Sequence, residues 1–399
     1  MFRLSEFLRE IGRPTPPRAR RNLPGPVVIW NLVRRCNLQC RHCYAVSADV
    51  DFPGELSTAQ VLRVMDDVRA AGSPALILSG GEPLLRPDIF EISQRAKKLG
   101  FYTSLSTNGT LIGDAMADRI AEAGYDYVGV SLDGVGAVHD RFRGRSGAFA
   151  DALAGLRACR DRGVKVGVRF TMTSENHLEL PALLKLVEVE RIDKFYLSHL
   201  VYAGRGNKNR GTDAGWGVTR DAMNLLFDHA WDSLERGQTR EFVTGNNDAD
   251  AVFLLMWTQR RFPEQAAHLR AKLVGWGGNA SGVNVANIDN VGDVHPDTMW
   301  QSHTIGNVRE RAFGDIWKDR SDPIMAGLNA RPRIISGRCG ACAHFDICGG
   351  NTRVRAWRLT GDAFAEDPAC YLDDAEIGAP PAPRVQLRPF RGMKHETVA

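Results

Sequence analysis

The chain has 399 residues, of which 43% are hydrophobic and 25% charged, and its formal net charge at pH 7 is +4. This length suffices for two domains, or for one large domain with an appendage, and the apolar content is that of an ordinary globular protein with a full core. So small a positive excess does not indicate nucleic acid binding, although it suits an acidic substrate.

The N-terminal segment, residues 1–25, has no long apolar core and runs into the basic, proline-rich stretch from Arg13 to Pro26, which excludes a signal peptide. No uninterrupted apolar run of about 18 residues occurs, so no membrane span is predicted. We therefore expect a cytoplasmic protein with neither a membrane nor a nucleic acid partner. In that compartment free thiols can hold metal clusters.

Apolar, β-branched segments alternate with amphipathic helical segments between residues 26 and 202. The predicted strands are 27–33, 75–78, 102–105, 127–132, 164–172 and 195–202, and the predicted helices are 57–71, 88–99, 114–123, 148–162 and 178–190. In the first helix, Ser57 and Gln60 have capping-box spacing. Six βα units joined by short loops imply an α/β fold with a parallel sheet, and their regular repeat favours a curved, partial (β/α)6 barrel over residues 26–210. In such a fold, ligands bind at the carboxyl ends of the strands.

Three cysteines, Cys36, Cys40 and Cys43, lie within eight residues directly after the first predicted strand. A disulfide between any two would leave an odd thiol, whereas thiolates this close together suit zinc or an iron-sulfur cluster. A 4Fe–4S cluster normally takes four cysteines, so a three-cysteine loop leaves one iron open for a substrate or cofactor. The alternative is a zinc site with His42 as the fourth ligand.

Polar motifs follow the next three predicted strands. Ser79-Gly-Gly-Glu-Pro83 ends the second strand, where the two glycines allow close backbone approach to a ligand and Glu82 can meet a cationic amine. The candidate ligand-binding residues of these strand ends are Gly80, Gly81, Glu82, Ser106, Asn108 and Ser131, with Arg143 shortly beyond. His199, at the end of the sixth predicted strand, is a candidate catalytic residue that faces either the cavity or the core.

Beyond the alternating region, residues 204–211 are basic and glycine-rich and are predicted to form a flexible linker. A helical connector, 211–274, is expected to contain helices over 219–236 and 248–260. The segment 275–377 is glycine-rich and irregular, with a hairpin-like stretch from Val283 to Val294. The tail, 378–399, is predicted to be disordered.

A second group of cysteines, Cys339, Cys342, Cys348 and Cys370, lies in the segment 275–377. Four thiolates saturate a site, and an all-cysteine site fits both zinc and iron-sulfur. The remaining cysteine, Cys159, lies alone in a predicted helix and is expected to be a buried structural residue.

The Cys-x3-Cys-x2-Cys spacing, the Gly80-Gly-Glu-Pro83 turn and Arg143 together resemble the radical S-adenosylmethionine (SAM) enzymes over residues 26–205. The resemblance implies a 4Fe–4S cluster on the three cysteines, with an open iron that chelates SAM, and places the seven strand-end residues around SAM. Beside such a core, the second cysteine group is similar to the auxiliary-cluster extension called SPASM or twitch. Asn279, Ser281 and Asp297 stand where the larger SPASM form would have further cysteines, which implies one auxiliary 4Fe–4S cluster.

Residues 31–49 and 51–57 are closely similar to the NirJ family, the radical SAM enzymes of heme d1 biosynthesis. This implies an iron-bound tetrapyrrole substrate, didecarboxysiroheme, two of whose propionates are replaced by ring oxo groups, and a low-potential reductant such as ferredoxin or flavodoxin. Cationic residues available for the substrate carboxylates are Arg169, Arg205, Lys208 and Arg210. The alternatives are heme-synthase-type decarboxylation of coproheme propionates, peptide modification by a SPASM enzyme, and a two-cluster electron carrier, which would need no SAM pocket.

Overall fold

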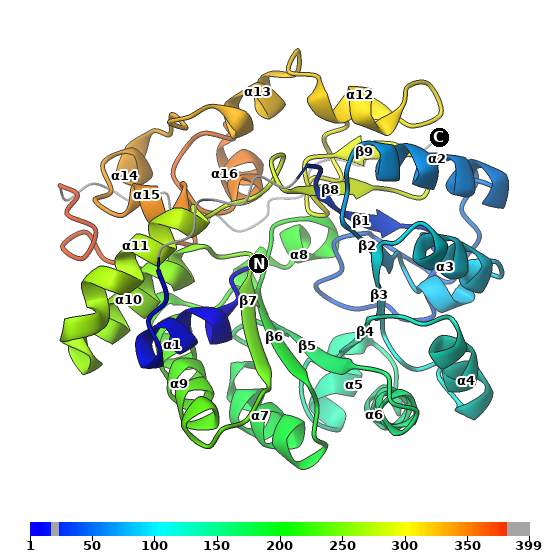
Figure 1. Cartoon of the computed structure of the whole chain (residues 1–399), viewed down its shortest axis with the longest axis horizontal. Helices are drawn as coiled ribbons and strands as arrows, with labels where there is room; N and C mark the ends of the chain where they lie inside the picture. Colours follow the sequence, from blue (N-terminus) through cyan, green and yellow to red (C-terminus); the bar gives the residue numbers. More distant parts are fainter. Residues whose placement is uncertain (17–23, 381–399) are drawn as a thin grey trace.

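The computed structural model of the protein describes residues 1–16 and 24–380. Its strands form one sheet in the order β10-β9-β8-β1-β2-β3-β4-β5-β6-β7. The pairs from β8 through β1 to β7 are all parallel, and the sheet curves into an incomplete barrel with helices on its outer side (Figure 1). The predicted partial α/β barrel is therefore confirmed.

All six predicted strands are present. They are β1 Val27–Asn31, β2 Ala75–Ser79, β3 Tyr102–Thr107, β4 Tyr127–Ser131, β5 Val166–Met172 and β6 Lys194–His199. The observed strand ends differ from the predicted ends by a few residues. The largest difference is at β6, which was predicted to reach residue 202 but stops at His199, because the chain turns there toward a short helix.

The predicted helices lie between these strands as α2 Thr58–Ala70, α3 Ile89–Lys98, α4 Asp114–Glu122, α6 Ala148–Asp161 and α7 Leu180–Val189, and a short helix α5 Ala137–Arg143 precedes α6. The capping box of α2 is confirmed: Ser57 Oγ accepts from the Gln60 backbone N–H at 3.3 Å, and Gln60 Oε1 accepts from the Ser57 N–H at 2.9 Å. These bonds satisfy donors that a helix start otherwise leaves open.

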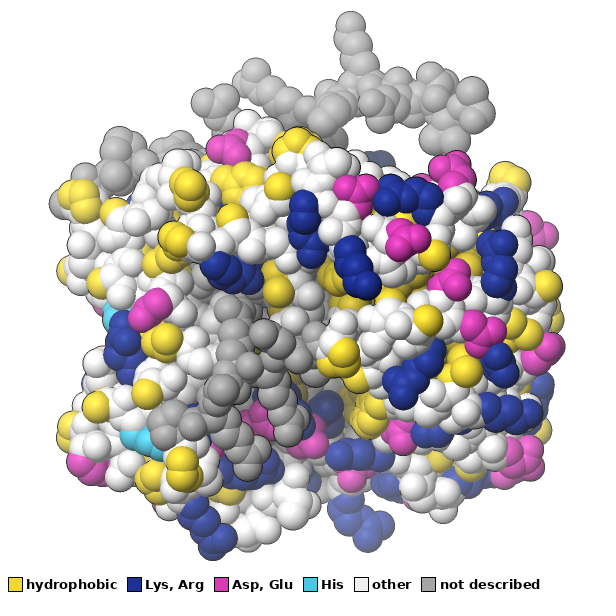
Figure 2. All heavy atoms as spheres, turned by 45° about the horizontal axis from the view of Figure 1, so that its top comes forward, with side chains coloured by type: hydrophobic (Ala, Val, Ile, Leu, Met, Phe, Trp, Pro, Cys, Tyr) yellow, Lys and Arg dark blue, Asp and Glu magenta, His cyan; other side chains and the backbone are white. Residues whose placement is uncertain are grey.

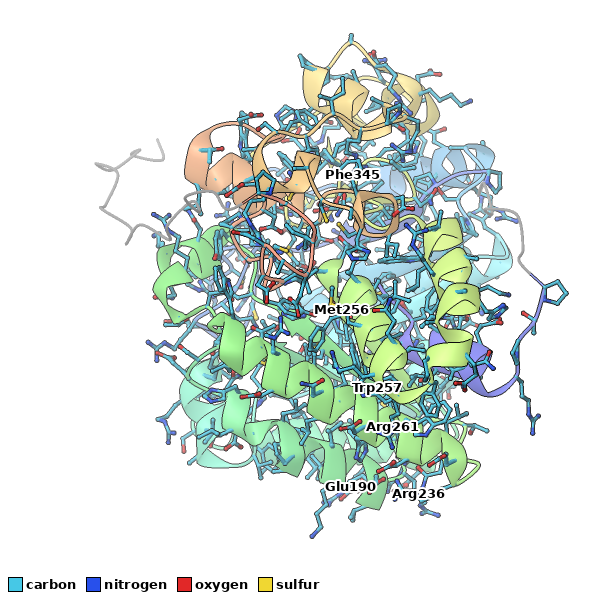
Figure 3. All side chains as sticks on the ribbon, turned by 90° about the vertical axis from the view of Figure 1, so that its left-hand side faces the viewer. Glu190, Arg236, Met256, Trp257, Arg261 and Phe345 are labelled. Atoms are coloured by element: carbon cyan, nitrogen blue, oxygen red, sulfur yellow. The ribbon has the colours of Figure 1, made fainter. Side chains whose placement is uncertain are left out.

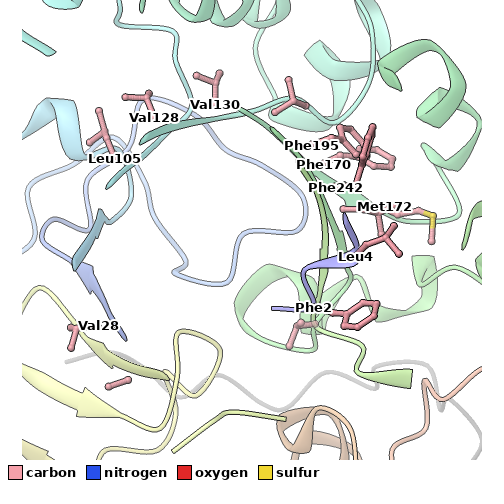
Figure 4. Close-up of a cluster of buried hydrophobic side chains, with 14 of the residues drawn as sticks. Phe2, Leu4, Val28, Leu105, Val128, Val130, Phe170, Met172, Phe195 and Phe242 are labelled. Atoms are coloured by element: carbon pink, nitrogen blue, oxygen red, sulfur yellow. The ribbon is translucent and has the colours of Figure 1, made fainter. Parts of the chain in front are cut away.

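The hydrophobic core lies between the sheet and the surrounding helices (Figure 4). Alternate residues of each strand face it, as the period of two requires. Val128 and Val130 of β4, Phe170 and Met172 of β5 and Phe195 of β6 are all fully buried. The intervening residues face the barrel interior, where a polar residue such as Arg169 remains partly accessible.

A seventh parallel strand, β7 Glu241–Gly245, was not predicted within the helical connector. It is short, and the chain N-terminus covers it: the backbone of Phe2 exchanges hydrogen bonds of 2.7 and 2.8 Å with Thr244. The helix α1 Leu4–Gly12 then packs on β7 and on α9 Trp216–Glu235. Two more helices, α10 Ala249–Arg261 and α11 Ala266–Trp276, follow in the connector.

The predicted hairpin is confirmed as β8 Val285–Ile288 and β9 Asp293–His295, which pair antiparallel. Unlike a separate module, it continues the barrel sheet, because β8 pairs in parallel with β1, and β10 Gly306–Asn307 adds to β9. The helices α12 Phe313–Lys318, α13 Pro323–Asn329, α14 Gly337–Gly340, α15 Phe345–Cys348 and α16 Arg353–Thr360 follow.

The cysteine-bearing C-terminal helices lie against the connector. Figure 3 shows Phe345 of α15 above α10, the helix that carries Met256 and Trp257, and α15 contacts both α10 and α11. The predicted disordered tail lies, apart from residues 378–380, outside the described residues.

None of the described helices combines the length and hydropathy needed to cross a membrane. On the face shown in Figure 2, Lys and Arg side chains are interspersed with Asp and Glu rather than gathered in one large patch of a single sign. This mixed surface agrees with the small net charge of +4.

Candidate functional site

The loop after β1 brings Cys36, Cys40 and Cys43 together at the carboxyl end of the barrel. Cys36 and Cys40 are buried, and burial raises the pKa of Cys36 to about 12, with the nearby thiols of Cys40 and Cys43 adding to the shift. Three mutually close thiols inside the protein are a donor set for a soft metal centre. The residues present therefore fit a 4Fe–4S cluster that keeps one iron free of protein ligands.

The two glycines after β2 are required by close contact with this loop. A Cβ on Gly80 would collide with the carbonyl oxygen of Val33, and one on Gly81 would collide with that of Arg35. The Gly81 N–H donates to Val33 O at 2.6 Å, and the Glu82 N–H donates to Arg35 O at 2.9 Å. The turn and the cysteine loop thus form one rigid backbone unit.

The Glu82 carboxylate is bonded to the turns that follow β2 and β3. It is fully buried and accepts hydrogen bonds from Thr107 Oγ1 at 2.7 Å, the Asn108 N–H at 2.8 Å and the Leu84 N–H at 3.2 Å. Burial raises its pKa to about 7, although these bonds oppose the shift. The geometry assigns Glu82 to holding the β2 and β3 turns together rather than to an open amine contact.

Asn108 connects the end of β3 to the cysteine loop. Its Nδ2 donates to Asn37 Oδ1 at 2.8 Å and lies 3.9 Å from Cys36 Sγ. Its Oδ1 accepts from both the N–H and the hydroxyl of Thr110. The side chain is thereby fixed beside the first thiol of the site.

Arg143 connects the cysteine loop to the end of β4. Its Nη1 donates to Cys40 Sγ at 3.4 Å, and its Nη2 lies 2.5 Å from Asp133 Oδ2 in a buried ion pair. Although burial opposes it, the guanidinium lowers the pKa of Asp133, so the pair is charged. Arg143, predicted as a ligand-binding residue, is therefore already paired within the protein. Asp133, two residues beyond Ser131, is a site residue that sequence reasoning did not single out.

Serine side chains at the ends of β3 and β4 converge with an arginine from the middle of β5. Arg169 is in register with Ser131, and its Nη1 donates to Ser106 Oγ. Its guanidinium lies 5.4 Å from the ring centre of Tyr196, and Gly129 leaves space for its stem, since a Cβ there would lie 2.9 Å from Arg169 Cδ. Among the described residues, no carboxylate forms an ion pair with Arg169. The barrel interior therefore holds a cation that is open to an anionic ligand.

The basic segment 204–211 is not a flexible linker, which corrects the prediction. It forms α8 Gly204–Lys208 and packs on the cysteine loop. Arg205 Nε donates to Cys40 O at 2.7 Å, its Nη1 donates to Ser47 O at 2.8 Å, and its backbone N–H donates to Cys43 O at 2.8 Å. The glycine start allows this approach, because a Cβ on Gly204 would collide with Tyr44 O.

His199 lies in a buried polar network rather than free in the cavity. Its Nε2 is 3.0 Å from Asp250 Oδ2, and Tyr371 Oη donates to Asp250 Oδ1 at 2.8 Å. Tyr371 follows Cys370 in the chain, so the network joins β6 and α10 to the second cysteine group. Nothing in the sequence marked Asp250 or Tyr371, because they lie far apart along the chain.

The second cysteine group is also assembled. Burial raises the pKa of Cys348 well above its usual value, and the thiols of Cys339, Cys370 and Cys342 add to the shift. Backbone N–H groups donate to two of the sulfurs, from His344 to Cys342 at 3.3 Å and from Asp367 to Cys339 at 3.4 Å. Four thiols, two of them buried and two partly buried, with such donors fit a fully ligated cluster.

Neither thiol set has the geometry of a single-ion site. Within residues 1–16 and 24–380, no group of three His, Cys, Asp or Glu side chains is arranged to hold one metal ion. The His42 ring packs at a tilt of 36° against Phe142, with ring centres 4.8 Å apart, and its Nε2 lies 3.6 Å from Asp133 Oδ2.

The three residues that replace further cysteines are engaged in hydrogen bonds. Asn279 Nδ2 donates to Asp248 Oδ2 at 3.3 Å, and its backbone N–H donates to Cys348 O at 3.1 Å. Ser281 Oγ donates to Asp297. These contacts need no metal.

Comparison with known proteins adds sequence relatives to this geometry. The family model of the Radical SAM superfamily matches residues 30–187, which run from β1 into α7. Pre-heme d1 synthase of Dinoroseobacter shibae is 59% identical over 399 residues, which cover 99% of this chain and 98% of that protein. Fe-coproporphyrin III synthase of Methanosarcina barkeri is 44% identical, with 88% of this chain and 89% of that protein covered.

A solved structure gives the same fold at much lower identity. Streptococcus suis SuiB bound to S-adenosylmethionine superimposes with a TM-score of 0.67 at 18% identity, covering 88% of this chain and 78% of that one. The fold match thus extends past the barrel into the segment that carries the second cysteine group. Both sequence relatives also extend over that segment.

Proposed function

Because this chain belongs to the radical SAM superfamily, we propose that it is the radical SAM enzyme of heme d1 biosynthesis, acting on propionate side chains of an iron tetrapyrrole such as didecarboxysiroheme. The observation that carries this proposal is the 59% identity to pre-heme d1 synthase over almost the full length of both chains. Such coverage includes the barrel and both cysteine groups.

The family cofactors are a 4Fe–4S cluster and SAM; with one electron delivered through the reduced cluster, they would supply a 5'-deoxyadenosyl radical able to abstract hydrogen from the substrate. In this chain Cys36, Cys40 and Cys43 would hold the cluster. The protein binds and orients both reactants and excludes water from them. Arg205 and Arg143 hold the cysteine loop in place from two sides.

SAM is proposed to lie along the ends of β2, β3 and β4. The backbone at Gly80 and Gly81 would face its amino group, and the hydroxyls of Ser106 and Ser131 would reach its polar groups. Asn108, Glu82 and Arg143 act mainly by fixing these turns, since their side chains already bond to the protein. The predicted residue set is retained, with positioning roles for these three.

Arg169 is the proposed contact for a substrate carboxylate. It projects into the barrel interior, stacks on Tyr196 and has no acidic partner among the described residues. A guanidinium binds a carboxylate through paired, charge-assisted hydrogen bonds. Arg205 is the weaker candidate for this role, because its Nε and Nη1 donate to loop carbonyls and only its buried Nη2 has no hydrogen-bond partner.

The second cysteine group is proposed to hold an auxiliary 4Fe–4S cluster on Cys339, Cys342, Cys348 and Cys370. Full ligation by four cysteines disfavours direct substrate coordination and favours electron transfer or substrate placement. A low-potential carrier such as ferredoxin or flavodoxin would supply electrons.

A second candidate is the heme-synthase type of reaction, decarboxylation of coproheme propionates. It is favoured by the 44% identity to Fe-coproporphyrin III synthase. Both reactions place a propionate beside SAM, so the barrel geometry alone does not separate them.

The test is to incubate the anaerobically reconstituted enzyme with SAM, dithionite and either didecarboxysiroheme or coproheme, and to weigh the tetrapyrrole products. We expect propionate loss from didecarboxysiroheme that depends on SAM. Turnover of coproheme alone would establish the second candidate. Formation of 5'-deoxyadenosine without change in either tetrapyrrole would contradict both.

A further inference from the structure

The four-cysteine site poses a problem of charge. Four thiolates around a 4Fe–4S core of charge +2 sum to −2, and the sulfurs are largely buried. A buried charge is stable only when opposite charge or strong hydrogen bonds compensate it. The protein around this site should therefore supply positive charge that is not already neutralised.

Arg333 is one such cation. It is 6% exposed, its Nη2 donates to Leu328 O at 2.8 Å, and its Nη1 donates to Gly349 O at 2.9 Å, one residue beyond Cys348. Its Nε is buried without a hydrogen-bond partner. The bond to Gly349 places the guanidinium beside the peptide that follows Cys348.

Arg353 is the second such cation near the four-cysteine site. It is 0% exposed, and its donors go to backbone carbonyls only: Nε to Asn351 O at 3.2 Å, Nη2 to Gly350 O and Nη1 to Ala365 O. It interacts electrostatically with Cys339. Among the described residues, neither Arg333 nor Arg353 has a carboxylate in ion-pair contact.

Two neighbouring arginines differ in this respect. Arg338 Nε bonds to Asp374 at 2.6 Å, and Arg355 bonds to Asp367 through two nitrogens at 2.7 and 2.9 Å. Each of these pairs is neutral overall. Asp248 interacts electrostatically with Arg333, but Asn279 lies between the two and contacts both.

We propose that Arg333 and Arg353 are the counter-cations of the four-cysteine centre and that they raise its reduction potential. The inference rests on the auxiliary cluster of the proposed function and adds the residues that set its electronic property. Reduction adds one negative charge, so a buried positive charge close by stabilises the reduced form more than the oxidised form. Their two positive charges match the −2 charge of the oxidised centre.

The test is a potentiometric titration of the full-length holoenzyme with dithionite, followed by EPR. Added SAM identifies the signal of the first cluster, because only that cluster has an open iron. The variants are Arg333→Met and Arg353→Met, with Arg333→Lys and Arg353→Lys to keep the charge. Arg320→Met is the matched control, since Arg320 also donates to carbonyls, of Trp317 and Asp319, but is exposed.

At the wild-type midpoint potential, we expect the ratio of oxidised to reduced auxiliary cluster to be about tenfold higher in each Met variant than in the wild type. This corresponds to a midpoint potential about 59 mV lower for one electron. The Lys variants and Arg320→Met should stay near wild type. Loss of the auxiliary irons from the Met variants but not from the Lys variants would also support the counter-cation role.

An unchanged potential in both Met variants with full iron content would overturn the inference, as would equal loss of iron from the Met and Lys variants. Metal analysis of the wild type separates this from failure of the proposed function. One bound zinc in place of the second cluster would show that the auxiliary cluster does not exist. Tetrapyrrole turnover by the wild type, together with an unchanged potential in the Met variants, would reject only the role of the arginines.

Discussion

At the scale of single residues, the site depends on a few side chains that bond to the cysteine loop. Asn108 is fixed beside Cys36, and Arg143 donates to Cys40 while paired with the buried Asp133. These contacts cross between three strand ends. Each cysteine is thus held by groups that approach from a different part of the barrel.

Replacing Cys36, Cys40 or Cys43 by Ala should abolish SAM cleavage, because two remaining thiolates do not hold the cluster in its SAM-binding form. The measurement is 5'-deoxyadenosine formed under anaerobic reducing conditions. Cys159→Ala is the matched control, since Cys159 is fully buried in α6 and belongs to neither thiol set. Normal 5'-deoxyadenosine formation by a variant lacking all three cysteines would rule out the assignment.

Replacing Arg169 by Gln should weaken binding of didecarboxysiroheme by about tenfold to a hundredfold, because a charge-assisted pair contributes roughly 1.5 to 3 kcal/mol. Uncoupled SAM cleavage should fall less than the substrate affinity, because Arg169 reaches the proposed SAM contacts only through its bond to Ser106. A spectroscopic titration measures the affinity.

The control for Arg169 is Lys165→Ala, which removes a cation just before the start of β5, at the opposite end of the strand, where Lys165 pairs with Glu241. Equal affinity of the Arg169 variant and wild type would assign Arg169 to the protein framework rather than to the substrate.

At the scale of elements, the short helix α8 holds the cysteine loop through hydrogen bonds. Its Arg205 spans two carbonyl groups of that loop, and its N-terminal glycine permits the contact. Lys208 of the same helix is exposed. One face of α8 therefore carries a positioning function and the other faces solvent.

Arg205→Ala should reduce the iron retained at the first site and, with it, SAM cleavage, since two charged hydrogen bonds of about 1.5 to 3 kcal/mol each are lost from the loop. Iron content after gel filtration is the measurement. Lys208→Ala, on the same helix, should retain wild-type iron. Equal retention in the two variants would mean that the loop holds its shape without α8.

The strand β7 is completed by the N-terminal segment. Phe2 is 1% exposed, exchanges backbone bonds with Thr244, and lies with its ring centre 4.9 Å from that of Phe7 and 5.1 Å from that of Trp276. The residues before and within α1 thus cover the edge of the barrel that β7 would otherwise expose.

Phe2→Ala should lower the free energy of unfolding by about 3–5 kcal/mol, the usual cost of emptying a buried aromatic site. The urea midpoint measured anaerobically at equal iron content reports the change. Leu178→Ala, at a position 79% exposed, should stay within about 0.5 kcal/mol of wild type. A midpoint for Phe2→Ala equal to that of the control would show that the N-terminal segment does not stabilise the barrel.

At the scale of the whole molecule, a buried ion pair attaches the second cysteine group to the barrel. Arg355 and Asp367 are each 0% exposed in their side chains, and Arg355 Nη1 also donates to Asn246 O at 2.6 Å and to Leu200 O at 3.2 Å, beyond β7 and β6. The Asp367 N–H donates to Cys339 Sγ. The second site is thus positioned directly from the carboxyl ends of two barrel strands.

The reconstituted wild type should carry about eight irons per chain, four in each of two 4Fe–4S clusters. Replacing Cys339, Cys342, Cys348 and Cys370 together should leave about four irons and a functional SAM site, because the two thiol sets lie in different segments. Metal analysis and the yield of 5'-deoxyadenosine measure both. One tightly held zinc beside only four irons in the wild type would contradict the auxiliary cluster.

Features that depend on local spacing were determined by the sequence alone. The alternation of apolar and amphipathic segments predicted six strands and five helices, because periods of 2 and 3.6 residues reflect burial on one face. The cysteine spacing and the Gly80-Gly81 turn predicted the cluster loop, since ligands and turn residues there are close in the chain.

Features that depend on distant segments were decided only by the tertiary structure. The strand β7 contains only two apolar residues, Phe242 and Val243, and its pairing with Phe2 joins distant parts of the chain. The polar segment 204–211 forms a helix because the cysteine loop accepts its hydrogen bonds. Likewise, sequence gives Glu82 and Arg143 as charged residues near a ligand. Only the fold shows that Glu82 accepts a hydrogen bond from Thr107 and that Arg143 forms an ion pair with Asp133, because those partners lie at the ends of other strands.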